Sequence, residues 1–184
     1  LGAFDPAHSA LAQAIHLLRE IHDPYWEAGA HTAVARLLHM RGDYTAAAQA
    51  CQRALACSAG RIPFFEHRAL TYYGDTYWMN GDLLTAEQLY QRALALQTKA
   101  QLAYCLAEPA IRLAELHRQR NDYNGALALL AKPLALLQQQ GPAGVAEPFG
   151  VYFIAYRVWK ALHDPRAERL LEQAYHLFQA TLAN

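Results

Sequence analysis

The chain has 184 residues, of which 54% are hydrophobic and 17% are charged, so it is long enough to bury a continuous core in one structural unit. Its 16 basic and 16 acidic side chains cancel, and this balance disfavours direct binding to nucleic acid or to an anionic membrane surface. No stretch approaches the roughly 18 consecutive apolar residues that cross a bilayer, and no basic-then-apolar signal pattern opens the chain, so we expect a cytoplasmic protein.

The first residue and the cysteines add two expectations. Because the chain begins with Leu1 and not with methionine, we expect it to be a segment of a longer protein or a processed product. Cys51, Cys57 and Cys105 are an odd number at unpatterned spacings, unlike the even framework of a disulfide-built secreted domain. We therefore expect them to be small buried hydrophobic residues.

Helical periodicity runs through the whole sequence, and no segment alternates as a strand would. The pattern predicts a leading helix at residues 7–22 and four helix pairs in a single domain that spans residues 1–184. The pairs occupy residues 25–58, 65–98, 102–139 and 147–182. Their helices are expected at 25–41, 44–58, 65–80, 83–98, 102–120, 123–139, 147–162 and 165–182.

A short turn sequence recurs inside each pair. It reads Arg41-Gly42-Asp43-Tyr44, Asn80-Gly81-Asp82-Leu83, Arg120-Asn121-Asp122-Tyr123 and Leu162-His163-Asp164-Pro165. A Gly, Asn or His can end one helix, and the Asp that follows can accept the free amide hydrogens of the next. The aspartates lie 39, 40 and 42 residues apart, and a period in this range indicates an array of supersecondary units.

Small residues recur at nearly the same distances from these turns, and two helices that cross closely leave no room for a large side chain. The first-helix positions are Ala35, Gly74, Ala114 and Ala155. The second-helix positions are Ala47, Ala86, Ala126 and Ala167, followed by Ala54, Ala93, Pro133 and Ala174. Eleven of these twelve residues are Ala or Gly. The alternative is an alanine-rich helical protein that satisfies a small-residue rule without repeats.

In this pattern the chain resembles the tetratricopeptide-repeat (TPR) family. The second pair matches best, with Gly74, Tyr77, Gly81, Ala86, Tyr90 and Ala93 at the family's offsets. The resemblance implies an all-α, right-handed superhelix of about nine antiparallel helices. Two features depart from it: the period is near 40 instead of the usual 34, and Pro133 stands where alanine is expected. We expect this proline to kink its helix, since it lacks an amide hydrogen.

A narrower resemblance covers the last 40 residues. The run from Glu147-Pro148-Phe149 through Tyr156-Arg157-Val158 to His163-Asp164-Pro165, together with the helix that follows, resembles the end of the TPR-like region in large bacterial signalling ATPases of the maltose-activator type. In that family the array is a sensor or protein-interaction platform that follows an ATPase domain. This chain has no phosphate-binding loop, cyclase signature or helix-turn-helix, so the resemblance extends to the array alone.

No motif of catalysis or metal binding is present. The nine histidines form no His-Glu-x-x-His face, and no Cys-x-x-Cys pair supplements them. Only Ser9 and Ser58 offer hydroxyl nucleophiles of the serine type, and neither lies in a Gly-x-Ser-x-Gly turn. Acid pairs such as Glu108 with Glu115 could exchange protons if buried together. On a helical array such charges usually face solvent or a peptide, so we expect no catalytic site, no metal and no cofactor.

The TPR resemblance also implies a concave groove, lined by the first helices of successive pairs. Transferring the family's groove offsets gives a partner-binding surface that mixes aromatic residues with both charge signs, as protein anchors require. It comprises Arg36, His39, Arg68, Thr71, Asp75, Trp78, Glu108, Glu115, Arg118, Tyr152, Tyr156 and Trp159. Trp78 and Trp159 could equally belong to the core between repeats.

The sequence therefore favours a non-catalytic protein-interaction or signal-sensing module of a larger bacterial regulator. A free-standing adaptor that binds a partner peptide is the alternative, and small-ligand sensing in the groove stays open. A homo-oligomer formed through the terminal helices is a third possibility, because the ends of an array leave apolar faces uncovered. Stacking of RNA bases on the groove aromatics is disfavoured by the zero net charge and by the presence of only three lysines.

Overall fold

The described part of the chain is built of helices, as the spacing of its apolar residues predicts. The computed structural model describes residues 4–102, 107–145 and 148–182, and no strand occurs among them. Their α-helices are α1 (Phe4–Glu20), α2 (Pro24–Arg41), α3 (Tyr44–Ser58), α4 (Pro63–Met79), α5 (Leu83–Lys99), α6 (Ala107–Gln119), α7 (Tyr123–Gln140), α8 (Pro148–Ala161) and α9 (Arg166–Leu182). A 3-10 helix, η2 (Pro142–Gly144), follows α7. The expected all-α class is confirmed.

Most helix ends lie close to the predicted ones. Prolines open α2 and α4, a position where the missing amide hydrogen costs nothing. Leu102, where the sixth helix was predicted to begin, is not helical, and the described part of α6 starts at Ala107. Residues 103–106 lie outside the described part, and so do Cys105 and Glu147.

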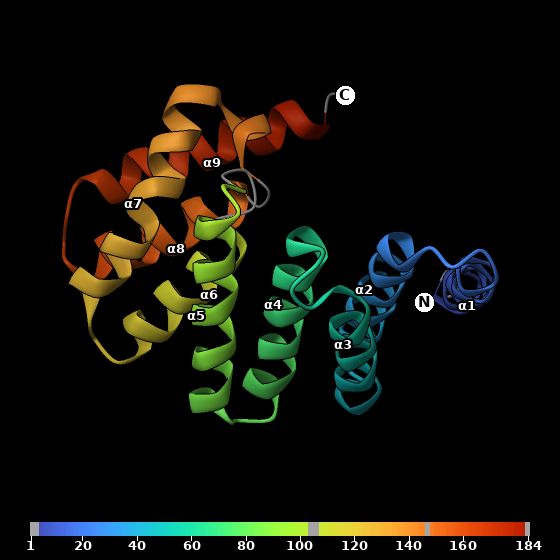
Figure 1. The fold of residues 1–184 in the computed structure, drawn as a ribbon. Coiled ribbons are helices and arrows are strands. Elements are labelled where there is room, and N and C mark those ends of the chain that lie inside the picture. The colour runs from blue at the N-terminus through green and yellow to red at the C-terminus, as the bar shows by residue number, and fades with distance from the viewer. Residues whose placement is uncertain (1–3, 103–106, 146–147, 183–184) are drawn as a thin grey trace. The chain divides into compact units, whose positions relative to one another are not determined.

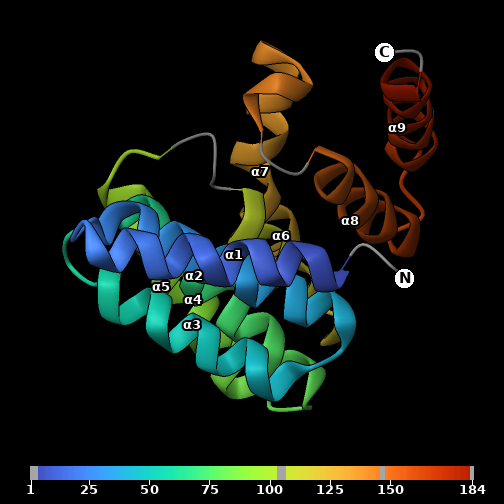
Figure 2. The ribbon, with the colours of Figure 1, turned by 90° about the vertical axis from the view of Figure 1, so that its right-hand side faces the viewer.

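The helices divide into two compact units, Leu1–Ala100 and Gln101–Asn184. In the first unit α2 packs on α3 and α4 packs on α5, while α2 also contacts α4 and α3 contacts α4. The leading helix α1 lies along α2, as Figure 2 shows from the side. Figure 1 shows how these helices lie beside one another. Leu38, Cys51 and Tyr72 belong to the core around α2, and Leu70 and Leu89 to the core between α4 and α5.

The second unit repeats this arrangement. There α6 packs on α7 and α8 on α9, while α8 also contacts both α6 and α7. Its core includes Ile111, Leu130, Val151, Val158 and Leu170, all buried. Pro133 is buried inside α7, which continues as one helix to Gln140.

The small-residue positions are where the helices meet. Eleven of the twelve predicted positions are buried, and Ala174 is half-buried. At Gly74 an added Cβ would lie 2.5 Å from Cε1 of Tyr90, so α4 and α5 touch there with no space for any side chain. A chance enrichment in alanine would not place these residues at the crossings of successive helices.

The turns also have the predicted chemistry. Gly42, Gly81, Asn121 and His163 have positive φ angles, which stop each first helix. After them Asp43, Asp82 and Asp122 each accept a hydrogen bond from the backbone N–H three residues on, at 2.9–3.0 Å. Asp164 instead accepts from the Arg166 N–H two residues on, at 2.9 Å.

A fifth turn of this kind, not among the four predicted ones, lies between α1 and α2. His22 has a positive φ of 55°, and Asp23 accepts a hydrogen bond from the N–H of Trp26 at 3.1 Å. The sequence contains the pattern of this turn, because Ile21-His22-Asp23-Pro24 has the same His-Asp-Pro after an apolar residue as Leu162-His163-Asp164-Pro165.

Two further expectations can be compared with the structure. Cys51 is buried and Cys57 is half-buried, and burial raises the pKa of the Cys51 thiol to about 12, so this side chain stays a neutral apolar group. Within the described ranges, no helix is both long and apolar enough to cross a membrane.

Candidate protein-interaction site

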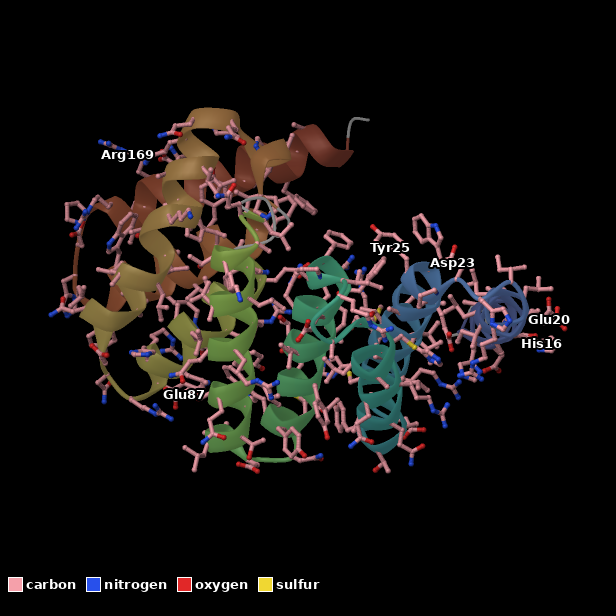
Figure 3. The ribbon with its side chains drawn as sticks, viewed as in Figure 1. His16, Glu20, Asp23, Tyr25, Glu87 and Arg169 are labelled. Atoms are coloured by element: carbon pink, nitrogen blue, oxygen red, sulfur yellow. The ribbon has the colours of Figure 1, made fainter. Side chains whose placement is uncertain are left out.

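The candidate site in the first unit is a cleft between α1, α2 and α4. Two ion pairs fix α1 along α2, one near each end of the helix pair. Arg19 of α1 donates to Glu27 of α2 at 2.6 Å, and Arg41 of α2 donates to Asp5 of α1 at 3.1 Å. Figure 3 shows His16 and Glu20 on the outer side of α1, away from α2. The inner side of α1 therefore forms one wall of the cleft.

This α2–α4 cleft has a volume of about 570 Å³, within the range of ligand-binding pockets. Most of its described lining is apolar. The residues are Ala7 and Leu11 from α1; Gly29, Thr32, Ala33, Arg36, Leu37 and Met40 from α2; and Phe65, Arg68 and Tyr72 from α4. None of these described lining residues is an Asp or Glu, so both charged side chains in the cleft are cationic.

The two arginines are held differently. Arg68 is half-buried: its Nη2 donates to the hydroxyl of Tyr72 at 3.1 Å, and its guanidinium lies 5.8 Å from the centre of the Phe64 ring. Arg36 is exposed on α2. Thr32 is buried, and its hydroxyl already donates to the carbonyl of Ala28 at 2.7 Å. The cleft therefore combines an apolar surface with two guanidinium groups.

Aromatic rings close one end of the cleft, where α2 and α4 begin. The Phe65 ring lies 5.0 Å from Tyr25 and 6.3 Å from Trp26, measured between ring centres. It also covers Gly29, where an added Cβ would come within 2.7 Å of the ring. Figure 3 shows Tyr25 at this end of α2. Leu11, Phe65 and Tyr72 were not predicted, because the groove offsets of the TPR family include neither α1 nor the buried side of α4.

Four other predicted residues of this unit lie outside the described lining of the cleft. His39 is half-buried, with its ring centre 5.4 Å from that of Tyr44. Thr71 is completely buried and donates to the carbonyl of His67. Asp75 accepts from the hydroxyl of Tyr90 at 2.8 Å, and Trp78 lies 6.1 Å from the same ring. Asp75 and Trp78 thus contact α5.

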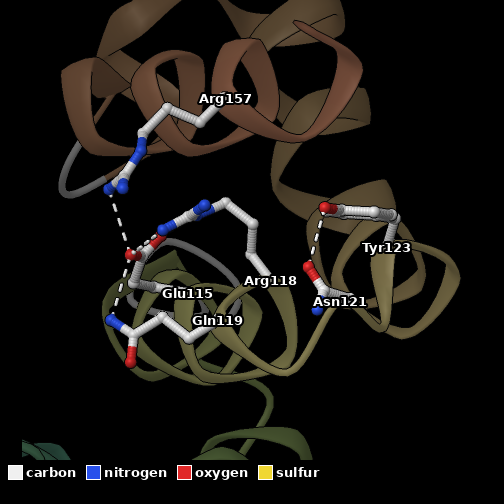
Figure 4. A network of polar contacts seen from close by, with 6 residues as sticks. All are labelled: Glu115, Arg118, Gln119, Asn121, Tyr123 and Arg157. Atoms are coloured by element: carbon white, nitrogen blue, oxygen red, sulfur yellow. Dashed lines mark hydrogen bonds and ion pairs between the residues drawn. The ribbon is translucent and has the colours of Figure 1, made fainter. Parts of the chain in front are cut away.

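In the second unit, the predicted residues of α6 make contacts within the chain (Figure 4). Glu115 accepts from Arg118 at 2.8 and 2.9 Å, and from Arg157 of α8 at 3.0 Å. Gln119 donates to the same carboxylate at 3.2 Å. Burial alone would raise the pKa of Glu115, but these hydrogen bonds and the two positive charges outweigh it and lower the pKa. Glu108 is buried, with 6% of its surface exposed.

The predicted aromatic residues of α8 do not share one surface. Tyr152 and Trp159 line a second cleft, between α7, α8 and α9. The hydroxyl of Tyr156 instead accepts from Lys160 Nζ at 2.9 Å. Tyr152, Tyr156 and Trp159 all pack partly against the core of the unit. Arg157, which the prediction omitted, is the α8 residue that reaches Glu115.

The described residues include no cluster of metal-binding side chains. They contain no group of three or more His, Cys, Asp or Glu side chains that could hold an ion. Burial lowers the pKa of His67 to about 4, and its Nδ1 lies 2.8 Å from Nε2 of Gln97. This histidine is therefore neutral near pH 7 and joins α4 to α5.

Comparison with known proteins identifies the fold. No protein-family model matches the chain, and no curated protein sequence matches it. Among solved structures, the chain is similar to BtubC (BKLC) from P. vanneervenii, with a TM-score of 0.77 and 21% identity over 100% of this chain and 76% of that one. It is also similar to the nearly identical TPR-like repeats of a putative kinesin light chain from Podosopora anserina. There the TM-score is 0.63, with 18% identity over 98% of this chain and 89% of that one. The chain thus has a TPR-like fold.

Proposed function

We propose that this chain is a non-catalytic interaction module that holds an acidic segment of a partner protein in the α2–α4 cleft. The observation that carries the proposal is the described lining of the cleft: an apolar surface with the exposed guanidinium of Arg36 and no Asp or Glu side chain. A TPR-like fold is generally a protein-binding module, which supports the same function. The occupant has a carboxylate close to an apolar side chain, because these two groups complement the lining.

The first step of the test is to block the cleft without changing its charge. Ala33 lines the cleft and is exposed, so an Ala33→Trp substitution fills the space while leaving the core untouched. Ala56 is an exposed alanine on α3, away from the lining, and Ala56→Trp is the matched control. Peptides selected by the wild-type chain from a random display library should lose binding to Ala33→Trp and keep it to Ala56→Trp. Equal binding to both variants would place the interaction elsewhere.

The second step tests the charge. Arg36→Glu should weaken the selected peptides about tenfold or more, because a charge-assisted hydrogen bond is replaced by repulsion. Arg92 is exposed on α5, outside the cleft lining, and Arg92→Glu makes the same charge change as a control. Isothermal titration calorimetry of Glu-containing peptides against their Gln versions measures both effects. If the affinity changed neither with Arg36→Glu nor with the Glu-to-Gln change in the peptide, the proposal of an acidic occupant would be refuted.

The wider setting proposed for the module is the interaction or sensing part of a larger cytoplasmic bacterial regulator. The resemblance of the last 40 residues to the TPR-like region of maltose-activator-type ATPases supports this setting. The full reading frame tests it directly. A phosphate-binding loop upstream agrees with a regulator, whereas a short frame without further domains agrees with a free-standing adaptor.

Self-association is a second candidate function, favoured by the surface of α9. Leu171, Tyr175 and Phe178 follow one another at helical spacing, and between 47% and 59% of each side chain is exposed. A second copy that packs on this face would bury them. Light scattering across micromolar concentrations measures the mass. A Leu171→Lys variant should stay monomeric where the wild-type chain dimerises, and a wild-type chain that is always monomeric excludes the candidate.

A further inference from the structure

A second cleft lies within the unit of residues 101–184. It has a volume of about 640 Å³ and is lined by residues of α7, η2, α8 and α9. Figure 2 shows α8 between α7 and α9. Of the predicted groove residues only Tyr152 and Trp159 line this cleft, because most of its described lining comes from α7 and α9, which are second helices.

The apolar part of this α7–α9 cleft comes from all three helices. Leu134 and Leu137 of α7 face Leu170 and Leu177 of α9, and the Tyr152 and Trp159 rings of α8 complete the surface. Burial raises the pKa of the Tyr152 hydroxyl, which therefore stays a neutral hydrogen-bond donor. A flat or branched hydrocarbon body fits such a surface, because it buries apolar area on several sides at once.

The basic and acidic side chains of α9 differ in whether they line the cleft. Arg166, Arg169 and His176 line the cleft, together with Gln173, whereas Glu168 and Glu172 of the same helix do not. No Asp or Glu occurs among the described lining residues. The cleft therefore presents donors and positive charge from α9, while α7 contributes Leu134, Leu137 and one uncharged polar side chain, Gln138.

One of these cations is already neutralised. Arg166 donates from Nε and Nη2 to the carboxylate of Asp164, at 2.9 and 2.6 Å, and its guanidinium lies 4.6 Å from the centre of the Trp159 ring. Arg169 has no such carboxylate among the described residues, and Figure 3 shows its side chain extending beyond the ribbon. Arg169 is thus the cation that remains available to an anion.

The indole of Trp159 adds to the positive character of the wall. Its Nε1 is buried and has no acceptor in the described structure. An N–H dipole without an acceptor leaves a local positive potential, which favours an anion nearby. The described lining offers no negative group to balance it.

From this arrangement we propose that the α7–α9 cleft binds a small organic carboxylate with an apolar, ring-sized body. The carboxylate pairs with Arg169 at the mouth, and the body lies between Leu134 and Leu170 against the Tyr152 and Trp159 rings. The site is separate from the α2–α4 cleft and does not depend on the function proposed for it. It would let the second unit sense a metabolite while the first unit holds a protein.

The test uses two probes of the same shape, naphthylacetate and its neutral amide, naphthylacetamide. Binding to the 184-residue chain is followed by the Trp159 indole N–H signal in NMR spectra, which Trp159→Phe identifies among the three tryptophans. Naphthylacetate should shift this signal saturably, and naphthylacetamide should bind about tenfold more weakly or worse, because it lacks the charge that Arg169 pairs with.

Two variants separate a specific site from general attraction to a cation. Arg169→Gln should remove the advantage of the acid over the amide. Lys132→Gln, which removes one exposed charge from α7 outside the described cleft lining, should leave that advantage unchanged. No shift of the Trp159 signal at millimolar naphthylacetate would overturn the proposal. Equal binding of acid and amide, or an acid preference that survives Arg169→Gln, would overturn it too.

Discussion

The two units place first helices side by side in the same way but use the charges between them differently. Between α6 and α8 the carboxylate of Glu115 takes hydrogen bonds from Arg118, Gln119 and Arg157, so these groups satisfy one another. Between α2 and α4, the exposed Arg36 lines a cleft whose described lining contains no Asp or Glu. A repeat position therefore predicts where a side chain lies, while its neighbours decide whether it is available to a partner.

The largest expected effect tests whether both units follow one packing register. Ala86 and Ala126 occupy the same repeat position and have no exposed surface. Ala86→Phe and Ala126→Phe should each lower the free energy of unfolding by about 1–3 kcal/mol, because a ring at a helix crossing overpacks the core. Chemical denaturation followed by circular dichroism measures the loss.

The matched controls for this prediction lie on the same two helices. Ala95 on α5 and Ala131 on α7 are exposed, so Ala95→Phe and Ala131→Phe should change the stability by less than about 0.5 kcal/mol. If Ala126→Phe were as harmless as Ala131→Phe, the second unit would not share the register of the first.

A smaller change in folding stability should distinguish a charged residue paired within the chain from one that lines the cleft. Arg157→Gln removes an ion pair to Glu115, whose side chain is only 12% exposed, and should cost about 1 kcal/mol of folding stability. Arg36→Gln should leave the stability within about 0.5 kcal/mol, since Arg36 is exposed on the helix surface. Thermal and denaturant unfolding of the two variants provide the comparison. Equal losses of unfolding free energy in the two variants would show that Arg157 and Arg36 do not differ in this way.

The smallest effect concerns pH. The folded chain lowers the pKa of Glu115 below its ordinary value of 4.5, so the stabilisation is complete above that value. It is lost as the pH falls through the lower pKa of the folded state, because the unfolded chain then binds the proton more readily. Glu115→Gln should flatten this part of the profile of unfolding free energy against pH. A variant with an unchanged slope would show that other carboxylates produce it.

The sequence predicted the helices and turns well because their causes are local. Asp43, Asp82 and Asp122 cap helices through backbone amides three residues away, and Gly42 and Gly81 end helices through their own φ angles. The small residues were equally readable, since a close helix crossing at each repeat excludes large side chains whatever the partner sequence is. The fifth turn, at His22-Asp23, could have been predicted from the same residue pattern.

The groove was less predictable, because its availability depends on contacts between residues far apart in the chain. Asp75 bonds to Tyr90, fifteen positions on, and Glu115 to Arg157, forty-two positions on. No local sequence pattern predicts contacts between residues this far apart in the chain. Likewise the wall that α1 adds to the α2–α4 cleft follows from two ion pairs between α1 and α2.

The amino-acid order by itself thus determined the helical class, the repeat period and the residues that must be small, since each follows from backbone hydrogen bonding or steric exclusion within a few turns of helix. Only the tertiary structure decided which charged and aromatic side chains are satisfied internally and which line a cleft. The reason is physical: burial and ion pairing depend on distances between separate helices, and those distances are set by packing.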